Sequence, residues 1–102
     1  MLPGTVKVFA EAVAPGHIRH VSGPGSLTFG EWDGGPSDRV ARLADALDVP
    51  GIEVEAVDDV WAALWTKFLF VAPLGAVGAA TRAPVGVLRS EPETRGLSLI
   101  HI

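Results

Sequence analysis

Short runs of alternating apolar and polar residues, separated by turn residues, fill the first third of the chain. Residues 5–14, 17–21 and 26–31 show the alternation that is typical of half-exposed β-strands. Proline and glycine lie between these runs, and those at 22–25 predict a tight turn. Three short strands joined by tight turns predict an antiparallel meander.

One amphipathic helix is predicted after this meander. Ser37 is a suitable N-cap, and Asp38 places a carboxylate in the first helical turn, where the helix dipole favours it. Apolar residues then recur at helical spacing for about ten residues, and the proline and glycine at 50–51 end the pattern. Residues 52–57 alternate apolar and acidic side chains, which predicts a further strand with one solvated face.

The second half of the chain is dominated by one long apolar helix. The acidic residues at 58–59 are expected to begin a helix that continues to residue 72 and is apolar on nearly all sides. We expect this helix to be buried in a larger assembly, because 102 residues can hardly cover both of its sides.

Proline and glycine divide the helical region that follows. Pro73 is expected to kink or end the long helix, and the residues at 74–80, rich in glycine and alanine, can continue it. A break at 81–84 and two shorter helices, at 85–88 and from Glu91, are predicted to complete the region.

The change from strands to helices near residue 57 predicts a domain boundary. Residues 1–57 are assigned to the end of an α/β domain and residues 58–96 to the start of a helical domain. The last six residues, 97–102, hold two of the four isoleucines and match the translation of a transposon end used in preparing sequencing libraries. We therefore expect residues 97–102 to be a sequencing-adapter translation.

Composition excludes several classes of protein. Apolar residues make up 48% of the chain and its net charge is only −4, which argues against disorder. Eight basic residues face twelve acidic ones without a basic cluster, so no nucleic-acid partner is expected. The absence of cysteine excludes a disulfide scaffold and fits a cytoplasmic protein. The longest apolar run, 68–80, is interrupted by proline and glycine, so no membrane partner is expected.

Lys67 is the strongest candidate for chemistry. It is one of two lysines, and the residues three, four and seven positions away in the predicted helix are apolar. An ammonium group in such surroundings is costly to desolvate and gives up its proton more readily, which suits proton transfer or polarisation of a carbonyl. The alternative is a lysine that packs its stem against the helix and holds its amine in water.

The remaining polar and aromatic candidates have structural interpretations. His17 and His20 are expected on opposite faces of a strand without a third ligand, so no metal site is predicted. The acidic residues at 58–59 suit a helix start. Trp61 and Trp65 are one helical turn apart and are expected to pack together in a core. No GxGxxG or P-loop pattern occurs, so no nucleotide site is predicted within the chain.

Four segments, in this order, resemble the 2-dehydropantoate 2-reductase (ketopantoate reductase) family. They are AEAVAPGHIRHVSG, LTFGEWDG followed by SDRVARLADAL, GIEVEAVDDVWAALWTKFLFVAPLGAVGAATRAP and GVLRSEPETR, and they cover most of residues 4–96. The most specific part is the W-x-K-F block at 65–68. The resemblance implies an α/β fold class, with the last strands of a Rossmann-type NADP-binding domain followed by the first helices of an all-α C-terminal domain.

The resemblance also implies an activity and a site. The family reduces ketopantoate, a 2-keto acid, to pantoate with NADPH, on the route to pantothenate and coenzyme A, in a cleft between its two domains. The family lysine falls on Lys67, where it implies a general acid that protonates the ketone oxygen. The family's glycine-rich NADPH loop lies upstream of residue 1, so this chain alone is expected to be inactive. A homodimer is one possible assembly of the full-length protein.

Two positions depart from the family pattern. Well-known members carry asparagine four and eight residues after the lysine, whereas this chain has Val71 and Gly75. Neither side chain can form a hydrogen bond, so the departure concerns the substrate and not the fold. A related 2-keto acid is therefore an alternative to ketopantoate.

Two other functions remain open from the sequence. A two-domain enzyme of the 3-hydroxyacid dehydrogenase type also places a lysine on the first helix after its Rossmann domain. A small interaction module, without enzymatic activity, would dock its apolar helix on a partner helix.

Overall fold

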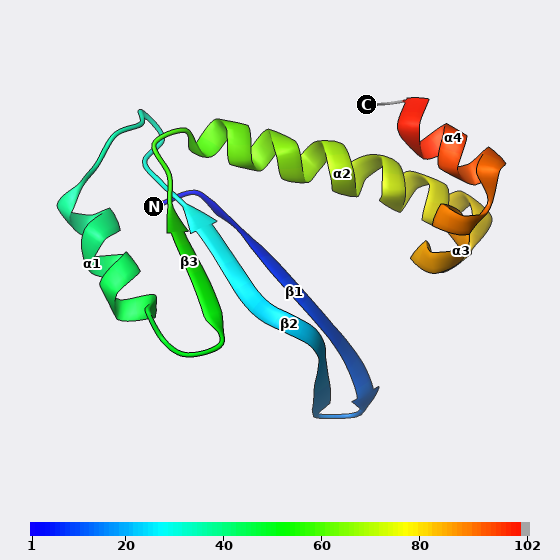
Figure 1. Cartoon of the computed structure of the whole chain (residues 1–102), viewed down its shortest axis with the longest axis horizontal. Coiled ribbons are helices and arrows are strands. Elements are labelled where there is room, and N and C mark those ends of the chain that lie inside the picture. Colours follow the sequence, from blue (N-terminus) through cyan, green and yellow to red (C-terminus); the bar gives the residue numbers. More distant parts are fainter. Residues whose placement is uncertain (101–102) are drawn as a thin grey trace. The chain divides into compact units, whose positions relative to one another are not determined.

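The structure, a computed structural model, describes residues 1–100, with side chains described to residue 97. Two compact units divide it, Met1–Leu64 and the residues from Trp65 onward. The elements are β1 (Gly4–Ala14), β2 (His17–Phe29), α1 (Asp38–Leu47), β3 (Ile52–Ala56), α2 (Val60–Thr81), α3 (Val85–Ser90) and α4 (Pro92–Ile100) (Figure 1). The fold class is therefore α/β, with a small sheet first and helices after it, as the sequence predicts.

The sheet is mixed, and the predicted three-stranded antiparallel meander is wrong. The strand order is β1-β2-β3; β1 pairs with β2 antiparallel, and β2 pairs with β3 parallel. Residues 17–29 form one strand, although the sequence predicts a turn at 22–25. The parallel pairing of β2 and β3 requires a crossover connection, and α1 supplies it.

A β-bulge explains why the glycine and proline residues of β2 make no turn. Lys7 pairs with Ser26 and Phe9 pairs with Ser22, so β2 has extra residues between two pairs that lie close together on β1. Gly23 adopts a φ of 66°, and Pro24 follows it without a backbone N–H to donate. The chain therefore absorbs these residues in the bulge and continues along β1.

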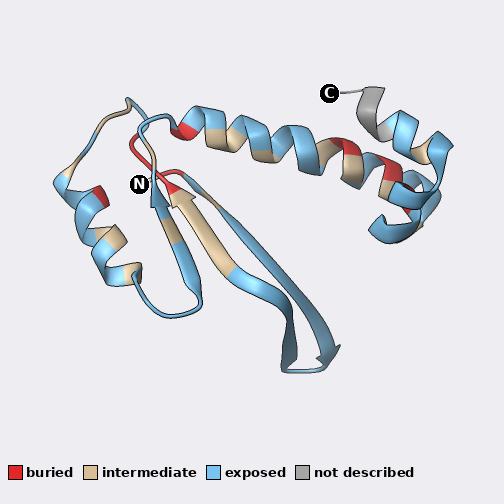
Figure 2. Ribbon diagram, viewed as in Figure 1, coloured by how far each residue is buried: buried red, intermediate tan, exposed pale blue. Residues whose placement is uncertain are grey.

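The buried apolar residues of the first unit come from β2, α1 and the start of α2. Phe29, Val40 and Val60 are buried, and Val60 is only 1% exposed (Figure 2). Ser37 caps α1 as predicted, because its hydroxyl accepts a hydrogen bond from the backbone N–H of Val40 at 3.2 Å. The amphipathic α1 packs against β3, which places the predicted apolar face towards the sheet.

In the second unit, α2 continues through Pro73 to Thr81, so a helix end at the proline is wrong. Pro73 is buried, and because proline lacks a backbone N–H the helix continues through it with one hydrogen bond fewer. Val77 and Leu88 are buried in this unit, Leu88 at 2% exposure. The predicted break after Thr81 is confirmed, and α3 and α4 follow it in contact with each other.

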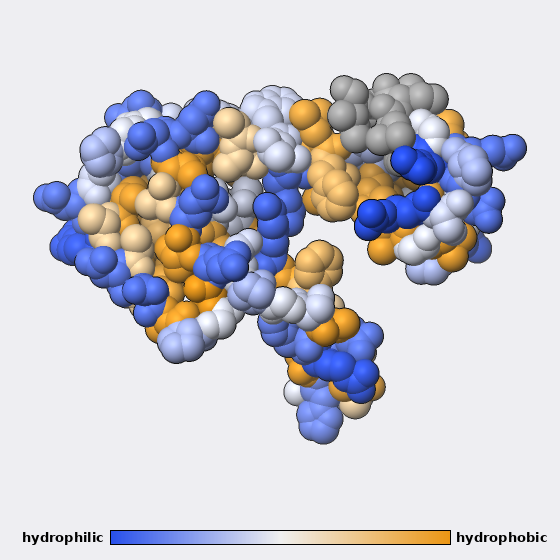
Figure 3. All heavy atoms as spheres, in the orientation of Figure 1, coloured by the Kyte–Doolittle hydropathy of each residue, from blue (hydrophilic) through white to orange (hydrophobic). Residues whose placement is uncertain are grey.

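Much of α2 is exposed within this chain, although it is strongly apolar. Five aromatic and aliphatic residues of its central turns, Trp65, Phe68, Leu69, Phe70 and Val71, are between 43% and 64% exposed. Orange spheres mark hydrophobic side chains on the visible face of this helix (Figure 3). The exposure agrees with the expectation that 102 residues cannot cover the helix.

By length and composition alone, α2 is the one helix of the described residues that could cross a membrane. The sequence argument against a span considered only the run at 68–80, whereas the helix starts earlier, at Val60. Core helices of soluble proteins pass the same test.

Candidate active site

Lys67 lies in the second turn of α2, and its residue is half-buried. The helix forms because the segment is rich in alanine, leucine and other apolar residues, and Asp59 caps it. The Oδ1 atom of Asp59 accepts a hydrogen bond from the N–H of Ala62 at 2.9 Å, which confirms a helix-start role for Asp59. The neighbouring Trp65 and Phe68 rings pack edge to face with centroids 5.6 Å apart. The lysine therefore emerges from a largely apolar stretch of helix.

Val71 and Gly75 follow Lys67 along the same side of α2, since residues four apart in a helix are neighbours. Val71 is 45% exposed, and a Cβ atom added to Gly75 would meet no other atom within 4 Å. The space beside Lys67 along the helix is consequently lined by an aliphatic side chain and an open glycine. Neither contributes a hydrogen-bonding side chain.

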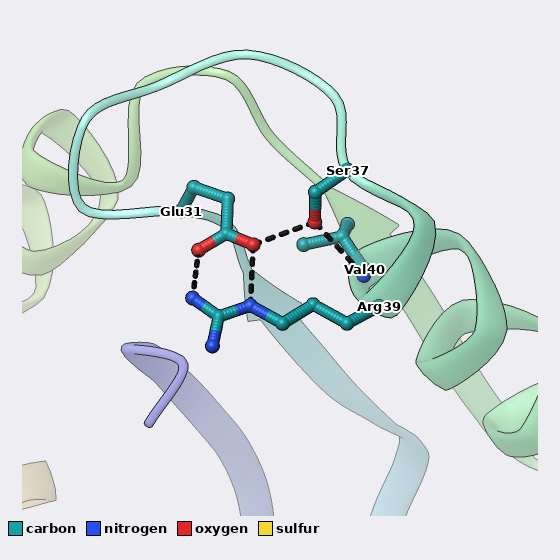
Figure 4. Close-up of polar contacts among 4 residues, drawn as sticks. All are labelled: Glu31, Ser37, Arg39 and Val40. Atoms are coloured by element: carbon teal, nitrogen blue, oxygen red, sulfur yellow. Dashed lines mark hydrogen bonds and ion pairs between the residues drawn. The ribbon is translucent and has the colours of Figure 1, made fainter.

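A polar cluster that the sequence did not reveal lies in the first unit, around Glu31. The Oε1 atom of Glu31 accepts hydrogen bonds from the Ser37 hydroxyl and from Arg39 Nε, each at 2.6 Å. Its Oε2 atom accepts a further bond from Arg39 Nη2, so the guanidinium binds the carboxylate in a bidentate manner (Figure 4). Glu31 is 8% exposed, and it is the one buried charged residue among those that the structure describes.

The ion pair changes the acidity of both partners. The hydrogen bonds from Arg39, and next the one from the Ser37 hydroxyl, lower the pKa of Glu31 from its ordinary value of 4.5 to about 2. The same contact raises the pKa of Arg39 above its ordinary value. Glu31 is therefore a permanent anion near neutral pH and cannot serve as a general acid there.

The tryptophans pair differently from the prediction. Trp61 packs against Trp32, with ring centroids 4.9 Å apart, and its Nε1–H donates to the Trp32 backbone carbonyl at 3.2 Å. Trp65 contacts Phe68. Both Trp61 and Trp65 are more than half exposed in this chain, at 52% and 57%.

A shallow apolar hollow of about 360 Å³ lies on the sheet of the first unit. Its walls come from all three strands and from the segment before β3: Val6, Val8, His20, Gly25, Ser26, Leu27, Gly51 and Ile52. His20 is the only titratable residue in this wall. No group of three potential metal-ligating side chains occurs among the described residues, and His17 and His20 both lie on β2.

Comparison with known proteins identifies the segment. The chain is 31% identical over 88 residues to the 2-dehydropantoate 2-reductase of Mesorhizobium japonicum, which covers 86% of this chain and 27% of that protein. The solved 2-dehydropantoate 2-reductase of Methylococcus capsulatus matches 98% of this chain with a TM-score of 0.77 and 26% identity. This chain corresponds to a segment of the ketopantoate reductase family.

The fold of this ketopantoate reductase segment agrees with a further structure. The 2-dehydropantoate 2-reductase of Geobacter metallireducens matches 95% of the chain with a TM-score of 0.80, at 24% identity. No protein-family model matches the chain. The chain spans 27% to 36% of the length of these three relatives.

The loop before α1 of this ketopantoate reductase segment does not fit a nucleotide phosphate. The loop between β2 and α1 is the place where a strand leads into a helix N-terminus, which is the usual position of a phosphate site. Glu31 and Asp38 bring carboxylates to that N-terminus, and Glu31 already occupies the Ser37 hydroxyl. The two carboxylates disfavour a further anion at this N-terminus, so no phosphate-binding residue is assigned to this loop.

Proposed function

We propose that the protein containing this chain reduces ketopantoate, or a related 2-keto acid, to the corresponding 2-hydroxy acid, with NADPH as hydride donor. The observation that carries the proposal is the 31% identity to a 2-dehydropantoate 2-reductase over 88 residues, a stretch that makes up 86% of this chain. The proposal places the protein in the cytoplasm, with the cofactor held by residues outside this chain.

Lys67 has the role of general acid in this proposal. Reduction of a ketone needs a hydride at the carbonyl carbon and a proton at the carbonyl oxygen. The Lys67 ammonium would donate a hydrogen bond to that oxygen, which polarises the carbonyl and then supplies the proton. Its half-buried place on an apolar stretch of α2 supports this role, because such surroundings strengthen the polarising effect of the charge.

The identity of the 2-keto acid depends on the residues beside Lys67. Val71 and Gly75 replace two family asparagines, and neither offers a hydrogen bond to a substrate hydroxyl or carboxylate. A site that lacks such donors discriminates weakly between a hydroxylated substrate and one without the hydroxyl. We therefore propose a broader 2-keto acid preference than that of relatives with both asparagines.

The test uses a chimera in which residues 4–96 replace the matching segment of the Mesorhizobium japonicum reductase. The chimera should reduce a 2-keto acid with NADPH, and Lys67→Ala should lower kcat by about 10² to 10⁴-fold, the usual contribution of general acid catalysis. NADPH binding, measured by fluorescence titration, should change little.

Lys7→Ala is the matched control, because Lys7 is the other lysine and lies exposed on β1. It should leave kcat unchanged. A folded chimera that binds NADPH but reduces no 2-keto acid would contradict the proposed function. An active chimera whose kcat survives Lys67→Ala would contradict the role of the lysine alone.

A further inference from the structure

Loop 30–37, which connects β2 to α1, is closed by the side chain of Glu31. The backbone carbonyl of Glu31 accepts a hydrogen bond from the Gly34 N–H at 3.3 Å. Its carboxylate binds Ser37 at the far end of the loop and Arg39 in the first turn of α1. One buried side chain thus ties both ends of the loop together (Figure 4).

The same loop holds the segment that leads into α2. The Val57 N–H donates to the carbonyl of Phe29, just before the loop, at 2.9 Å. Gly30 lies so close to this segment that an added Cβ atom would be 2.2 Å from the Val57 carbonyl oxygen. An added Cβ atom at Gly34 would be 3.0 Å from the carbonyl oxygen of Asp58. The backbone of the loop and that of residues 57–58 are therefore in close contact.

The loop also contacts the first turn of α2 through aromatic side chains. The Trp32 ring packs on Trp61, and the Trp61 indole N–H donates to the Trp32 carbonyl. Val60, between these contacts, is the most buried large residue of the unit at 1% exposure. The start of α2 thus has a defined place against loop 30–37.

We propose that Glu31 is a positioning residue: by closing loop 30–37 onto Ser37 and Arg39, it fixes the first turn of α2, the helix that carries Lys67. The link from Glu31 to α2 is the loop itself and its Trp32–Trp61 contact. The catalytic part of this statement rests on the proposed function, whereas the structural part concerns only residues of the first unit.

The structural part is tested on the 102-residue chain with Glu31→Gln, which keeps the shape of the side chain and removes its charge. Two coupled indoles at this separation give a paired circular dichroism band, and Trp32→Phe identifies it by abolishing it. Glu31→Gln should remove most of this band. It should also speed amide hydrogen exchange at Val57 and Ala62. The Val57 N–H donates to the Phe29 carbonyl, and the Ala62 N–H donates to the Asp59 carboxylate.

Glu11→Gln is the matched control, because Glu11 also pairs with an arginine, Arg19, at 3.1 Å, but on the exposed hairpin. It should leave the band and the exchange rates unchanged. Gly30→Ala should disturb the same two readouts without altering the ion pair. If Glu31→Gln prevents folding, Arg39→Lys, which keeps the charge but loses the bidentate geometry, should weaken the band in part. An unchanged band and unchanged exchange in both variants would overturn the proposal.

The catalytic part is tested in the chimera. Glu31→Gln should lower kcat while the KM for the 2-keto acid and the affinity for NADPH stay nearly constant, because only the placement of the general acid changes. Arg39→Lys should give a partial effect and Glu11→Gln none. A chimera without activity would contradict the proposed function and leave the dichroism result to decide the structural part. An equal loss of kcat and of NADPH binding would indicate general unfolding and overturn the catalytic part.

Discussion

Glu31 is a buried carboxylate whose ionisation depends on two partners from the next element. Arg39 and Ser37 both donate to it, and together they hold its pKa near 2. Because a buried anion without donors is costly, the loop conformation and the charge state depend on each other. This coupling should be visible in the pH dependence of stability.

Acid should remove the contribution of Glu31 to stability. The folded-state pKa of about 2 lies below the ordinary value of 4.5, so the ionised form stabilises the fold fully above about pH 4.5, and this stabilisation is lost as the pH falls through about 2. The free energy of unfolding, from urea titrations between pH 7 and pH 2, should differ between wild type and Glu31→Gln by an amount that shrinks in this window. A difference independent of pH would contradict the argument, and Glu11→Gln should show no comparable change.

The sequence could identify Ser37 and Lys67 but not Glu31. A helix N-cap can be read from a few neighbouring residues, and the structure confirms Ser37 as the N-cap of α1. Lys67 is found because its helical neighbours are apolar, and its role stays a prediction. Glu31 contacts Arg39, eight positions away, only once α1 has packed beside the loop. No rule of sequence spacing predicts that contact. The burial of Glu31 therefore requires the tertiary structure.

The helices and strands show the same limit of prediction from sequence. The helix at α1 and the strand at β3 were predictable, because their periodicity is clear over their whole length. In β2, the residues at 22–25 carry strong turn signals, yet pairing with β1 keeps the strand continuous through a bulge. In α2, the helix continues through Pro73 despite the helix-breaking tendency of proline. Local sequence patterns therefore predicted α1 and β3 correctly, but not the continuity of β2 and α2.

The α2 helix should tolerate asparagine at the positions that depart from the family. In Gly75→Asn, the new Cβ atom would meet no other atom within 4 Å. Asparagine is more favourable than glycine in a helix by about 0.3 kcal/mol, so the free energy of unfolding should rise slightly. In the chimera, the pair Val71→Asn and Gly75→Asn should raise kcat/KM for ketopantoate over that for simpler 2-keto acids. Thermal unfolding and steady-state kinetics check the two statements.

Gly78→Asn serves as the control on the same helix. Its added Cβ atom would lie 3.6 Å from Leu88 Cδ1, in van der Waals contact, so an asparagine there places its polar amide beside the buried Leu88. It should lower stability, whereas Gly75→Asn should not. A double asparagine variant with an unchanged substrate preference would contradict our account of specificity.

For the molecule as a whole, two compact units meet within α2, and the apolar surface of this helix exceeds what the chain can cover. The sequence predicts this excess from composition, and the exposure of the central turns of α2 confirms it. The predicted boundary between residues 57 and 58 stays a prediction, as do the adapter origin of residues 97–102 and the homodimer. Residues 101–102 lie outside the described part of the chain, so the structure does not bear on that terminal assignment.

The isolated chain should associate at concentrations where a well-covered domain stays monomeric. The exposed aromatic residues of α2 provide the driving force, since large apolar patches on soluble chains bind to one another. Sedimentation velocity over a range of concentrations should show a rising weight-average mass, and Phe68→Ser with Phe70→Ser should reduce it. A stable monomer at all concentrations would contradict this prediction and favour the interaction-module alternative.

The irregular register of β1 bears on what form such association takes. Register shifts occur between Lys7 and Phe9, between Phe9 and Ala10, and between Ala12 and Ala14. Strands that stack into fibrils need a long, flat, regular edge, and repeated bulges twist an edge and interrupt its row of hydrogen-bonding groups. The outer strand of this sheet is therefore a poor template for amyloid growth. We therefore expect association of this apolar chain to proceed through α2 and not through fibril growth on β1.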